Sequence, residues 1–365
     1  MSSLPDCHPH ILVAGAGING LMAAYYLIRA GARVTVCEAG PVPNPASASY
    51  GAHRLIHPWP PAGRPQEAAA AQRALPLWRA LLQDIGCSGF VQTGVLVASP
   101  EACDAAAGEH TLRLLPARAD ALLAGAAEMP GAVLFPEFGV LLAEKILSAL
   151  CNGLAKRGVE FLPRAPLRGL DTATGAADIA GGAPQRFDGI VCALGWKSRD
   201  LEHIAGAGEF LAQFSPRRSY VVYLPEAELP EARRPRTAWT GFLGQDLWGM
   251  PALGRNDAKF GCGLLTHSAD EPVLPDNEVR AKMAAAYSGA DPAYRALLNG
   301  RVASNIWAMC PFPGMVQQAG LCTVITSDTG GGFKTAPLAG LAACEAVLAA
   351  VPGWQDLKTQ KEQLT

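Results

Sequence analysis

Residues His10–Gly31 read HILVAGAGINGLMAAYYLIRAG, and this stretch decides the fold. A short apolar run ends at a glycine-rich turn, and a helix-forming segment follows until Gly31 closes it. The glycines have separate tasks: Gly15 permits the tight turn, Gly17 lets a pyrophosphate approach the backbone, and Gly20 lets helix and strand pack closely. The pattern predicts a dinucleotide-binding turn between a buried strand and a helix.

A second apolar strand, Arg33–Glu38, supports this interpretation because it ends in an acid. A carboxylate there is placed to accept hydrogen bonds from a ribose, and it disfavours a 2′-phosphate. Ile18 and Asn19 stand at the start of the helix, whose N-terminus would bind the diphosphate. Strand, turn, helix, strand and terminal acid together predict a Rossmann-type domain, but they do not distinguish FAD from NAD.

Composition excludes several classes of protein. The chain has 365 residues, of which 50% are hydrophobic and 17% charged, and its formal net charge is −2. This length predicts two domains or one interrupted domain, and the balanced charge argues against a surface that coats nucleic acid. No uninterrupted apolar run reaches the about 18–20 residues that a bilayer requires, and the first residues lack the features of a secretion signal. We therefore expect a cytoplasmic protein that binds neither nucleic acid nor membranes.

The ten cysteines are scattered along the chain and include no C-x-x-C pair. This spacing is typical of neither a zinc ribbon nor a disulfide framework, and we expect no metal site. Most of the cysteines are expected to be reduced core residues.

Three further stretches carry information. Residues 47–57 form a Ser- and Gly-rich loop that leads into basic and apolar residues, Phe187–Trp196 is an apolar strand that ends in Gly-Trp, and Gly330–Lys334 is a triple glycine followed by Phe and Lys. No second glycine fingerprint follows a strand, which argues against a flavoprotein with a separate NAD domain.

Together with the nucleotide-binding turn, these stretches resemble, in order and along nearly the whole chain, the monomeric sarcosine oxidase family of FAD-dependent amine oxidases, within the D-amino acid oxidase and glycine oxidase superfamily. The resemblance implies an α/β plus α+β fold, with a Rossmann-type FAD-binding domain and a discontinuous substrate domain built on a mostly antiparallel sheet. The FAD-binding segments would be 1–85, 136–212 and 312–365, and the substrate segments 86–135 and 213–311.

The resemblance also implies which residues bind FAD. The triple glycine would bring backbone N–H groups close to the flavin pyrimidine, and the helix after it would stabilise negative charge near N1 and O2. Arg54 would lie against the ring, while Ser47 and Ser49 would contact the diphosphate or ribose, unless they only form a polar loop. The residues assigned to FAD are Gly15, Gly17, Ile18, Asn19, Gly20, Glu38, Ser47, Ser49, Arg54, Gly195, Trp196, Cys310, Gly331, Gly332, Phe333 and Lys334.

Cys310 corresponds to the cysteine that links the flavin covalently in this family. A thiolate beside the 8-methyl group would form a thioether and raise the oxidising power of the flavin. The Pro-Phe-Pro that follows Cys310 departs from the family pattern, and a core cysteine is the alternative interpretation.

Two lysines are implied to act in catalysis. Lys334 matches the lysine that holds the substrate carboxylate, and Lys259 matches the lysine beside flavin N5 that promotes reaction with oxygen. The alternative for each is a lysine on the surface, at a helix start for Lys334 and on a strand for Lys259.

Three departures from the family pattern bear on the substrate. His57 stands where sarcosine oxidases have a second carboxylate-binding arginine, Tyr50 where they have a histidine, and Trp248 where they have a tyrosine. The family's other active-site histidine is replaced near Gly263, although His267 is close in sequence. Losing an arginine and gaining aromatic residues suggests a substrate larger or flatter than sarcosine.

We therefore expect an FAD-dependent amine oxidase, with catalytic residues Lys259, Lys334, Arg54, Trp248, Tyr50 and His57. It would oxidise a carbon–nitrogen bond of a carboxylate-bearing secondary or cyclic amine or imine and reduce O₂ to hydrogen peroxide. The alternatives are a dehydrogenase that uses another electron acceptor and a non-catalytic flavin-binding protein. The partners would be the small-molecule substrate and O₂, and the protein would be a monomer or a weak dimer.

Overall fold

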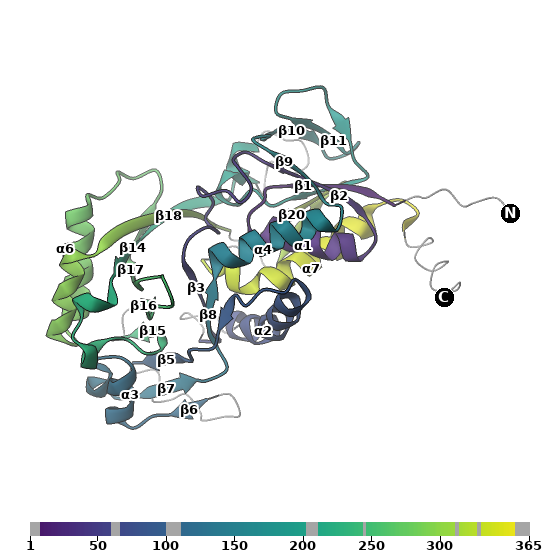
Figure 1. Ribbon diagram of the computed structural model, residues 1–365. Coiled ribbons are helices and arrows are strands. Elements are labelled where there is room, and N and C mark those ends of the chain that lie inside the picture. The colour runs from purple at the N-terminus through teal and green to yellow at the C-terminus, as the bar shows by residue number, and fades with distance from the viewer. Residues whose placement is uncertain are drawn as a thin grey trace.

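The computed structural model describes residues 8–59, 66–99, 111–201, 211–243, 246–310, 314–326 and 330–354. Two sheet-based halves lie side by side, one containing both ends of the described chain and the other containing helix α6 (Figure 1).

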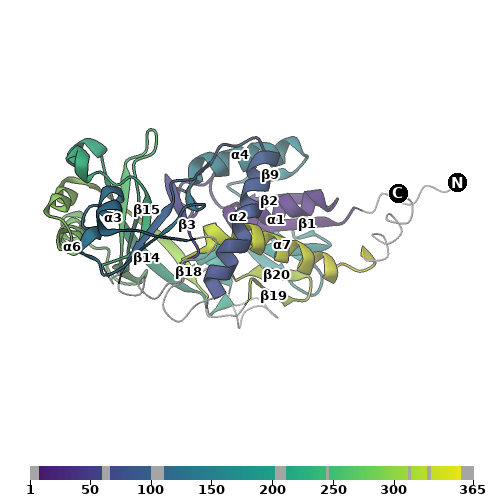
Figure 2. The same cartoon turned by 90° about the horizontal axis from the view of Figure 1, so that it is seen from below.

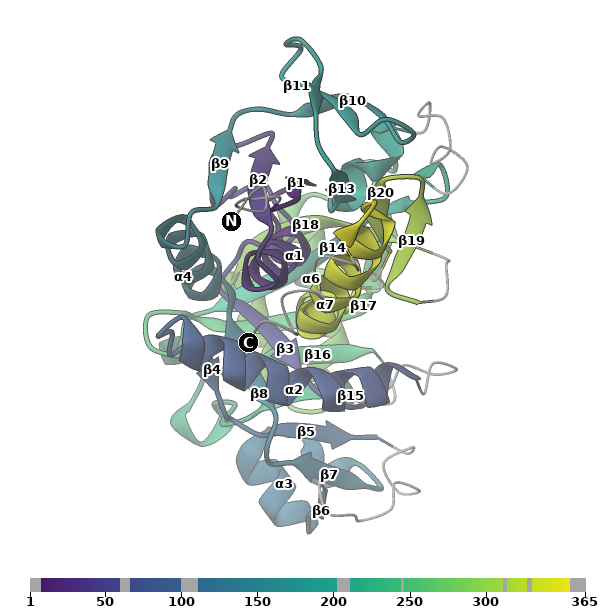
Figure 3. The same cartoon turned by 90° about the vertical axis from the view of Figure 1, so that its right-hand side faces the viewer.

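The nucleotide half is built on a six-stranded sheet in the order β19-β20-β13-β1-β2-β9, in which β1 pairs in parallel with β2 and β13. Helices α4, α1 and α7 line one face of this sheet, and the small sheet containing β10 and β11 lies beyond the other (Figure 3). The strands are β1 His10–Ala14, β2 Arg33–Glu38, β9 Glu160–Pro163, β13 Gly189–Cys192, β19 Val316–Ala319 and β20 Cys322–Ile325, and the helices are α1 Ile18–Arg29, α4 Ala143–Lys156 and α7 Gly332–Ala350.

The first strand–turn–helix unit explains why this half folds as it does. Strands β1 and β2 are almost wholly buried, as expected of parallel strands covered on both faces. Gly15 has φ +103°, a left-handed conformation that favours glycine. A Cβ on Gly20 would collide with the backbone oxygen of Gly15, so glycine there permits close packing of α1 on the turn.

The other half is an eight-stranded, mostly antiparallel sheet in the order β18-β14-β17-β16-β15-β5-β7-β6. Helix α6 and the 3₁₀ helix η6 pack on it around a separate hydrophobic cluster that includes Tyr287 and Tyr294. Its strands are β5 Val95–Ala98, β6 Leu112–Arg113, β7 Ala132–Phe135, β14 Ser215–Leu224, β15 Ala238–Phe242, β16 Leu247–Met250, β17 Ala258–Ser268 and β18 Arg301–Met309. The helices of this half are α3 Pro116–Leu122, η2 Ala126–Glu128, η4 Glu226–Glu228, η5 Glu231–Arg233, α6 Asp276–Ser288 and η6 Pro292–Asn299.

A three-stranded sheet, β3-β8-β4, lies between the halves, and α2 crosses beside α7 (Figures 1 and 2). The remaining elements are β3 His53–Ile56, α2 Gln66–Asp84, β4 Phe90–Val91, β8 Gly139–Leu142, β10 Leu167–Asp171, β11 Ala176–Ile179, β12 Gln185–Arg186 and η3 Gly195–Leu201.

The predicted combination of a Rossmann-type half and a mostly antiparallel half is confirmed. All strands of the six-stranded sheet fall in the segments that the sequence assigns to FAD binding, and all strands of the eight-stranded sheet fall in 86–135 and 213–311. The division into two domains remains an interpretation of these sheets.

Helix α7 differs from what the composition suggests. Among the described residues it is long and apolar enough to cross a membrane by length and hydropathy alone, although Lys334 and Glu345 interrupt its apolar run. However, 56% of the most apolar 18-residue stretch of this helix is buried inside the protein. Helix α7 packs against α1 and α2, so its apolar character is that of a core helix.

Candidate functional site

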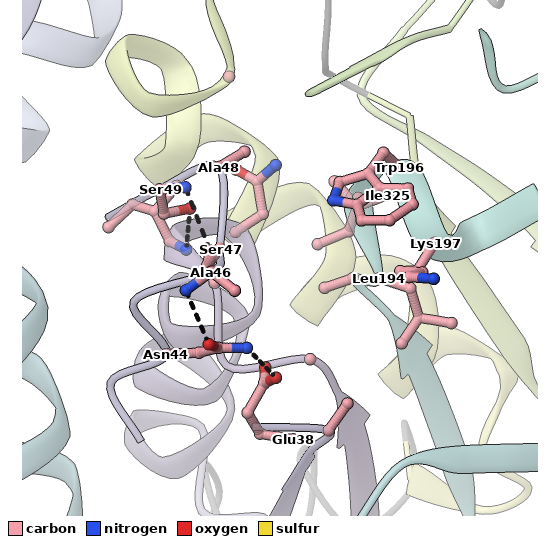
Figure 4. A pocket seen from close by; sticks show the side chains of 18 of the residues that line it. Glu38, Asn44, Ala46, Ser47, Ala48, Ser49, Leu194, Trp196, Lys197 and Ile325 are labelled. Carbon is pink, nitrogen blue, oxygen red and sulfur yellow. Dashed lines mark hydrogen bonds between the residues drawn. The ribbon is translucent and has the colours of Figure 1, made fainter. Parts of the chain in front are cut away.

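A cavity of about 610 Å³ opens at the carboxyl ends of β1, β2, β13 and β20. Ligands of open α/β sheets bind at such strand ends. One wall carries Glu38, Asn44 and the loop Ala46–Ser49, and it faces Leu194, Trp196, Lys197 and Ile325 across the cavity (Figure 4). Gly15, Gly17, Arg54, Gly332 and Phe333 line the same cavity, which therefore joins the nucleotide-binding turn to the start of α7.

Glu38 lines the cavity and is held in place by its neighbours. Its Oε2 accepts a hydrogen bond from the backbone N–H of Ala16 at 2.8 Å, and its Oε1 accepts from the N–H of Gly40 at 3.0 Å and from Nδ2 of Asn44 at 2.9 Å. A carboxylate offers about four acceptor positions, so capacity remains for a hydroxyl of a bound ligand. This arrangement fits the predicted role at a ribose.

The start of α1 forms a cradle together with the two serines. The N–H of Ile18 donates to Ser49 Oγ at 2.9 Å, and the N–H of Ser49 donates to Ser47 Oγ at 3.1 Å. A Cβ on Gly17 would lie 3.3 Å from Ser49 Oγ and 3.6 Å from Ser47 Oγ, so it would fill the space between helix and loop. Asn19 lines the cavity one residue further along the helix. The two serine hydroxyls and the N-terminus of α1 thus border one small space beside Gly17, which suits an anion.

Arg54, on β3, is held by hydrogen bonds to backbone oxygens of the residues that precede it. Its Nη1 donates to the backbone oxygen of His53 at 2.7 Å, and its Nη2 donates to the backbone oxygens of Ala48 and Tyr50, both at 2.6 Å. The guanidinium lies 5.8 Å from the ring centre of Phe333, and burial lowers its pKa. These contacts fix a half-buried cation at the end of the cavity where α7 begins.

Trp78 of α2 packs against the start of α7. The rings of Trp78 and Phe333 are stacked, with centres 5.6 Å apart and planes 6° from parallel. The indole Nε1 of Trp78 also donates to the backbone oxygen of Lys334 at 2.9 Å. The first turn of α7 is therefore fixed where Gly332 and Phe333 reach the cavity.

Lys334 is a buried residue, 8% exposed, and does not lie on the surface. Its Nζ lies 3.2 Å from Nε2 of His57, just beyond the end of β3. Burial and the positive charge of Lys334 hold the pKa of His57 well below its usual range. The structure thus brings Lys334, which the resemblance assigns to the substrate carboxylate, together with His57, which stands where the family has a second carboxylate-binding arginine.

Lys259 is also buried, with 3% of its surface exposed. Its Nζ donates to the backbone oxygen of His53 at 3.3 Å, and it lies 5.3 Å from the ring of Trp248 and 5.8 Å from the ring of Tyr223. Burial, with a contribution from the charge of Arg54, lowers the pKa of Lys259 well below its usual range. Lys259 is therefore not the surface lysine that was the alternative interpretation.

Among the described residues, no ion pair joins Arg54 or Lys259 to a carboxylate. Glu144 raises the pKa of Arg54, but desolvation outweighs it. The buried Lys259 and the half-buried Arg54 thus favour anionic groups near them. The same part of the chain holds no group of three or more His, Cys, Asp or Glu that could bind a metal ion.

The three aromatic residues predicted for the site, Trp248, Tyr50 and Trp196, lie in separate places. Trp248, on β16, covers Gly261 so closely that a Cβ there would collide with the indole, and it faces Lys259. Tyr50 packs on the main hydrophobic cluster, and its contact with Arg54 is made through its backbone oxygen. Trp196 lines the cavity with Gly195, which has φ +57°, and its ring lies 4.2 Å from Nζ of Lys197.

Cys310 is buried at the end of β18, in an apolar cluster that also contains Phe214 and contacts Trp196. Phe214 and Trp196 line the cavity, whereas Cys310 is not among the lining residues. Pro311–Pro313, where the sequence departs from the family pattern, lie outside the described residues.

Some residues of the site escaped sequence reasoning. Asn44 orients Glu38, Trp78 supports α7, and Phe214 lines the cavity, and none of them belongs to a motif. His53 is fully buried beside Lys259, and neither of its ring nitrogens has a hydrogen-bond partner among the described residues. Its only signal in the sequence was its place next to Arg54.

These features fit a flavin dinucleotide. Glu38 would suit a ribose, the cradle around Gly17 a diphosphate, and the glycines at the start of α7, with the basic side chains of Arg54 and Lys259 nearby, an electron-accepting ring. The fit rests on the open cradle, which a Cβ would fill, and on the hydroxyls that border it.

Comparisons with known proteins agree with this assignment. The chain matches the DAO family, described as FAD dependent oxidoreductase, over residues 10–346. It is 25% identical over 288 residues to a monomeric sarcosine oxidase of Bacillus sp. (strain NS-129), covering 74% of this chain and 71% of that protein. Among solved structures, it is similar in fold to an L-proline dehydrogenase from P. horikoshii, with TM-score 0.76, 17% identity and coverage of 94% and 95% of the two chains. A glycine oxidase from Geobacillus kaustophilus gives TM-score 0.74, 16% identity and coverage of 93% and 95%. The chain therefore belongs to the DAO family of FAD-dependent oxidoreductases.

Proposed function

We propose that the protein oxidises the carbon–nitrogen bond of a carboxylate-bearing secondary or cyclic amine to an imine, with O₂ as the electron acceptor. The amine loses two electrons and two protons as the single bond becomes a double bond. O₂ gains the same electrons and protons and becomes hydrogen peroxide. FAD, when bound, supplies the redox chemistry by accepting a hydride and passing the electrons on.

The observation that carries the proposal is a pair of basic side chains, the buried Lys259 and the half-buried Arg54, which have no carboxylate partner in an ion pair among the described residues. Burying such charges is costly unless an anionic group compensates them. An electron-rich reduced ring at the start of α7 would supply that compensation, and a fixed cation would stabilise negative charge as oxygen is reduced. This arrangement favours an oxidase.

The residues around Lys334 support a substrate with a carboxylate. Lys334 lies directly after Gly332 and Phe333, which line the cavity, and its Nζ lies next to His57. An ammonium at this position would hold the substrate by its acid group, and Trp248 would pack against the apolar part and exclude water. The hydride leaves a carbon bonded to a neutral amine, so the protein needs no strong nucleophile.

The relatives are consistent with this substrate class. Their names refer to sarcosine, glycine and proline, which are small amines that carry a carboxylate. For this chain the replacement of an arginine by His57, together with Trp248, supports an amine larger or flatter than sarcosine.

We further propose that Cys310 is joined to the flavin through a thioether, in which a bond from Sγ to the 8-methyl carbon replaces the S–H bond and one methyl C–H bond. The two electrons and two protons released would pass to O₂, which becomes hydrogen peroxide. The support is its place in the apolar cluster that contacts the cavity-lining residues Phe214 and Trp196.

Anaerobic titration of the FAD-loaded protein tests the proposed reaction. Sarcosine, N-methyl amino acids, proline and pipecolate would be screened for bleaching of the flavin absorbance, and air would then be admitted. We expect bleaching by at least one cyclic or N-methylated amino acid, followed by rapid return of colour with formation of hydrogen peroxide. Pyrrolidine and dimethylamine, which lack the carboxylate of proline and sarcosine, are the matched controls and should not bleach the flavin.

Two other outcomes would contradict the proposed oxidase reaction. Bleaching without reoxidation in air would replace the oxidase by a dehydrogenase with another acceptor. Absence of bleaching by every amine would leave a non-catalytic flavin-binding protein.

A further inference from the structure

Lys334, which is buried, and His57, which is half-buried, form a contact between two groups that are both basic. Nζ of Lys334, in the first turn of α7, lies 3.2 Å from Nε2 of His57, which follows β3. A lysine ammonium has hydrogen-bond donors only, so Nε2 of His57 must accept. The imidazole is then neutral and carries its proton on Nδ1.

The charged groups around His57 are mostly positive. Lys334 faces it from α7, Arg54 lies on β3, which ends just before His57, and Lys259 of β17 bonds the backbone oxygen of His53 on the same strand β3. Strands β8 and β16, which contact β3, carry no titratable side chain, and Glu144 of α4 acts on Arg54 and Tyr223. Burial and the charge of Lys334 therefore lower the pKa of His57 well below 6.5, and the imidazole is neutral at pH 7 in the absence of an anion.

A carboxylate bound at Lys334 would change this balance. Its negative charge would offset the ammonium and would lie next to the imidazole, and a nearby opposite charge favours the protonated form of histidine. His57 could then no longer serve as an acceptor for Lys334, but as an imidazolium it could donate to the carboxylate. Charge-assisted hydrogen bonds of this kind are the stronger ones.

We propose that Lys334 and His57 form a carboxylate site that takes up a proton when it is occupied, with His57 accepting from Lys334 in the empty site and donating to the carboxylate in the occupied site. This inference rests on the proposed function, because it concerns the acid group of the substrate. It makes His57 a determinant of specificity and of pH dependence.

The physical consequence is a link between affinity and pH. An arginine at position 57 would keep its charge at every pH of interest, whereas histidine binds a proton only together with the ligand. Carboxylate affinity therefore rises as the pH falls, by up to about tenfold per pH unit between the pKa values of the empty and the occupied site.

Acetate is a suitable probe, because it has the carboxylate without the amine and so cannot be oxidised or change its own amine protonation. Its binding to the FAD-loaded full-length protein would be measured by calorimetry at pH 7 in two buffers with different ionisation enthalpies, and by the flavin absorption spectrum from pH 6 to 8. We expect close to one proton taken up per acetate, and a dissociation constant that falls with pH.

Variants separate His57 from other titrating groups. His57→Asn and His57→Gln should bind acetate more weakly through Lys334 alone, with no proton uptake and little dependence on pH. His10→Asn is the matched control, since His10 lies on β1, hydrogen-bonded to Thr35, and should leave proton uptake unchanged.

The inference is overturned if acetate binds the unmodified protein without proton uptake, if uptake persists in both His57 variants, or if acetate does not bind. The first two results leave the proposed oxidation intact. Failure of the proposed function would show itself separately, as flavin bleaching by pyrrolidine or dimethylamine as well as by their carboxylated counterparts, or by no amine at all.

Discussion

Lys259 and His53 are joined by a hydrogen bond between the side chain of one and the backbone of the other, 3.3 Å from Nζ to O. The same backbone oxygen accepts a hydrogen bond from Nη1 of Arg54 at 2.7 Å. One carbonyl thus holds two basic side chains, Lys259 from β17 of the antiparallel half and Arg54 from β3 between the halves, and the ring of Trp248 lies beside Lys259. Carbonyl dipoles and aromatic faces, more than carboxylates, hold these charges where the cavity ends.

Replacing Lys259 by methionine should affect the reaction with oxygen more than the fold. Methionine has similar length and removes a buried charge, so the melting temperature should stay the same or rise. Reoxidation of the reduced flavin by O₂ should slow by about 100-fold or more, because a positioned electrostatic group is lost. Stopped-flow mixing of the anaerobically reduced protein with aerated buffer measures this rate.

The anaerobic rate of flavin reduction by substrate serves as the internal control, and it should change much less. An unchanged reoxidation rate in Lys259→Met would disprove the role of Lys259 in oxygen chemistry.

The pH dependence of reoxidation should report on Lys259. Burial and the charge of Arg54 lower the pKa of Lys259 well below 10.5, and the cation exists only below that lowered pKa. Reoxidation should therefore be fast at low pH and slow down as the pH rises through a midpoint below 10.5. In Lys259→Arg, whose guanidinium stays charged, the midpoint should move up or vanish. An identical profile in both proteins would assign the midpoint to another group.

Gly17 and Gly20 should respond differently to alanine. A Cβ on Gly17 meets only serine hydroxyls at 3.3 and 3.6 Å, so Gly17→Ala should fold but bind FAD about 10–100-fold more weakly, because the methyl group occupies the diphosphate cradle. A Cβ on Gly20 collides with the backbone of Gly15, so Gly20→Ala should lower the melting temperature or prevent folding. Thermal unfolding and FAD titration of the apoprotein measure both effects, and normal FAD affinity in Gly17→Ala would contradict the placement of the cradle.

The sequence predicted the nucleotide half of the fold well because its signals are local. The glycines, the apolar strands and the terminal acid all lie within His10–Glu38, and the helix and strands occur where the pattern places them. The antiparallel half was harder to predict from the sequence. Strand β18, Arg301–Met309, carries polar residues and was not predicted, since it is defined by pairing with β14. For the same reason β14 begins at Ser215, before its buried apolar run Tyr220–Leu224.

The candidate site shows the same distinction. Residues with a motif, such as Glu38 and Lys334, were identified from the sequence together with a family resemblance. The contact between Lys334 and His57 was not, because it joins residues 277 positions apart, and neither was the support of α7 by Trp78. Such contacts depend on tertiary packing and leave no periodic pattern.

Cys310→Ser should release the flavin from the denatured protein. If Cys310 carries a thioether to the flavin, acid precipitation of the unmodified protein leaves the yellow colour and fluorescence in the pellet, whereas the serine variant releases FAD into the supernatant. Cys37→Ser is the matched control, because Cys37 lines the cavity beside Glu38, and burial raises the pKa of its thiol to about 12. A thiol with such a pKa is a poor nucleophile, so this variant should keep its flavin in the pellet. Complete release of FAD from the unmodified protein would show that the flavin is held by non-covalent contacts alone and that Cys310 is a core residue of the cluster around Phe214.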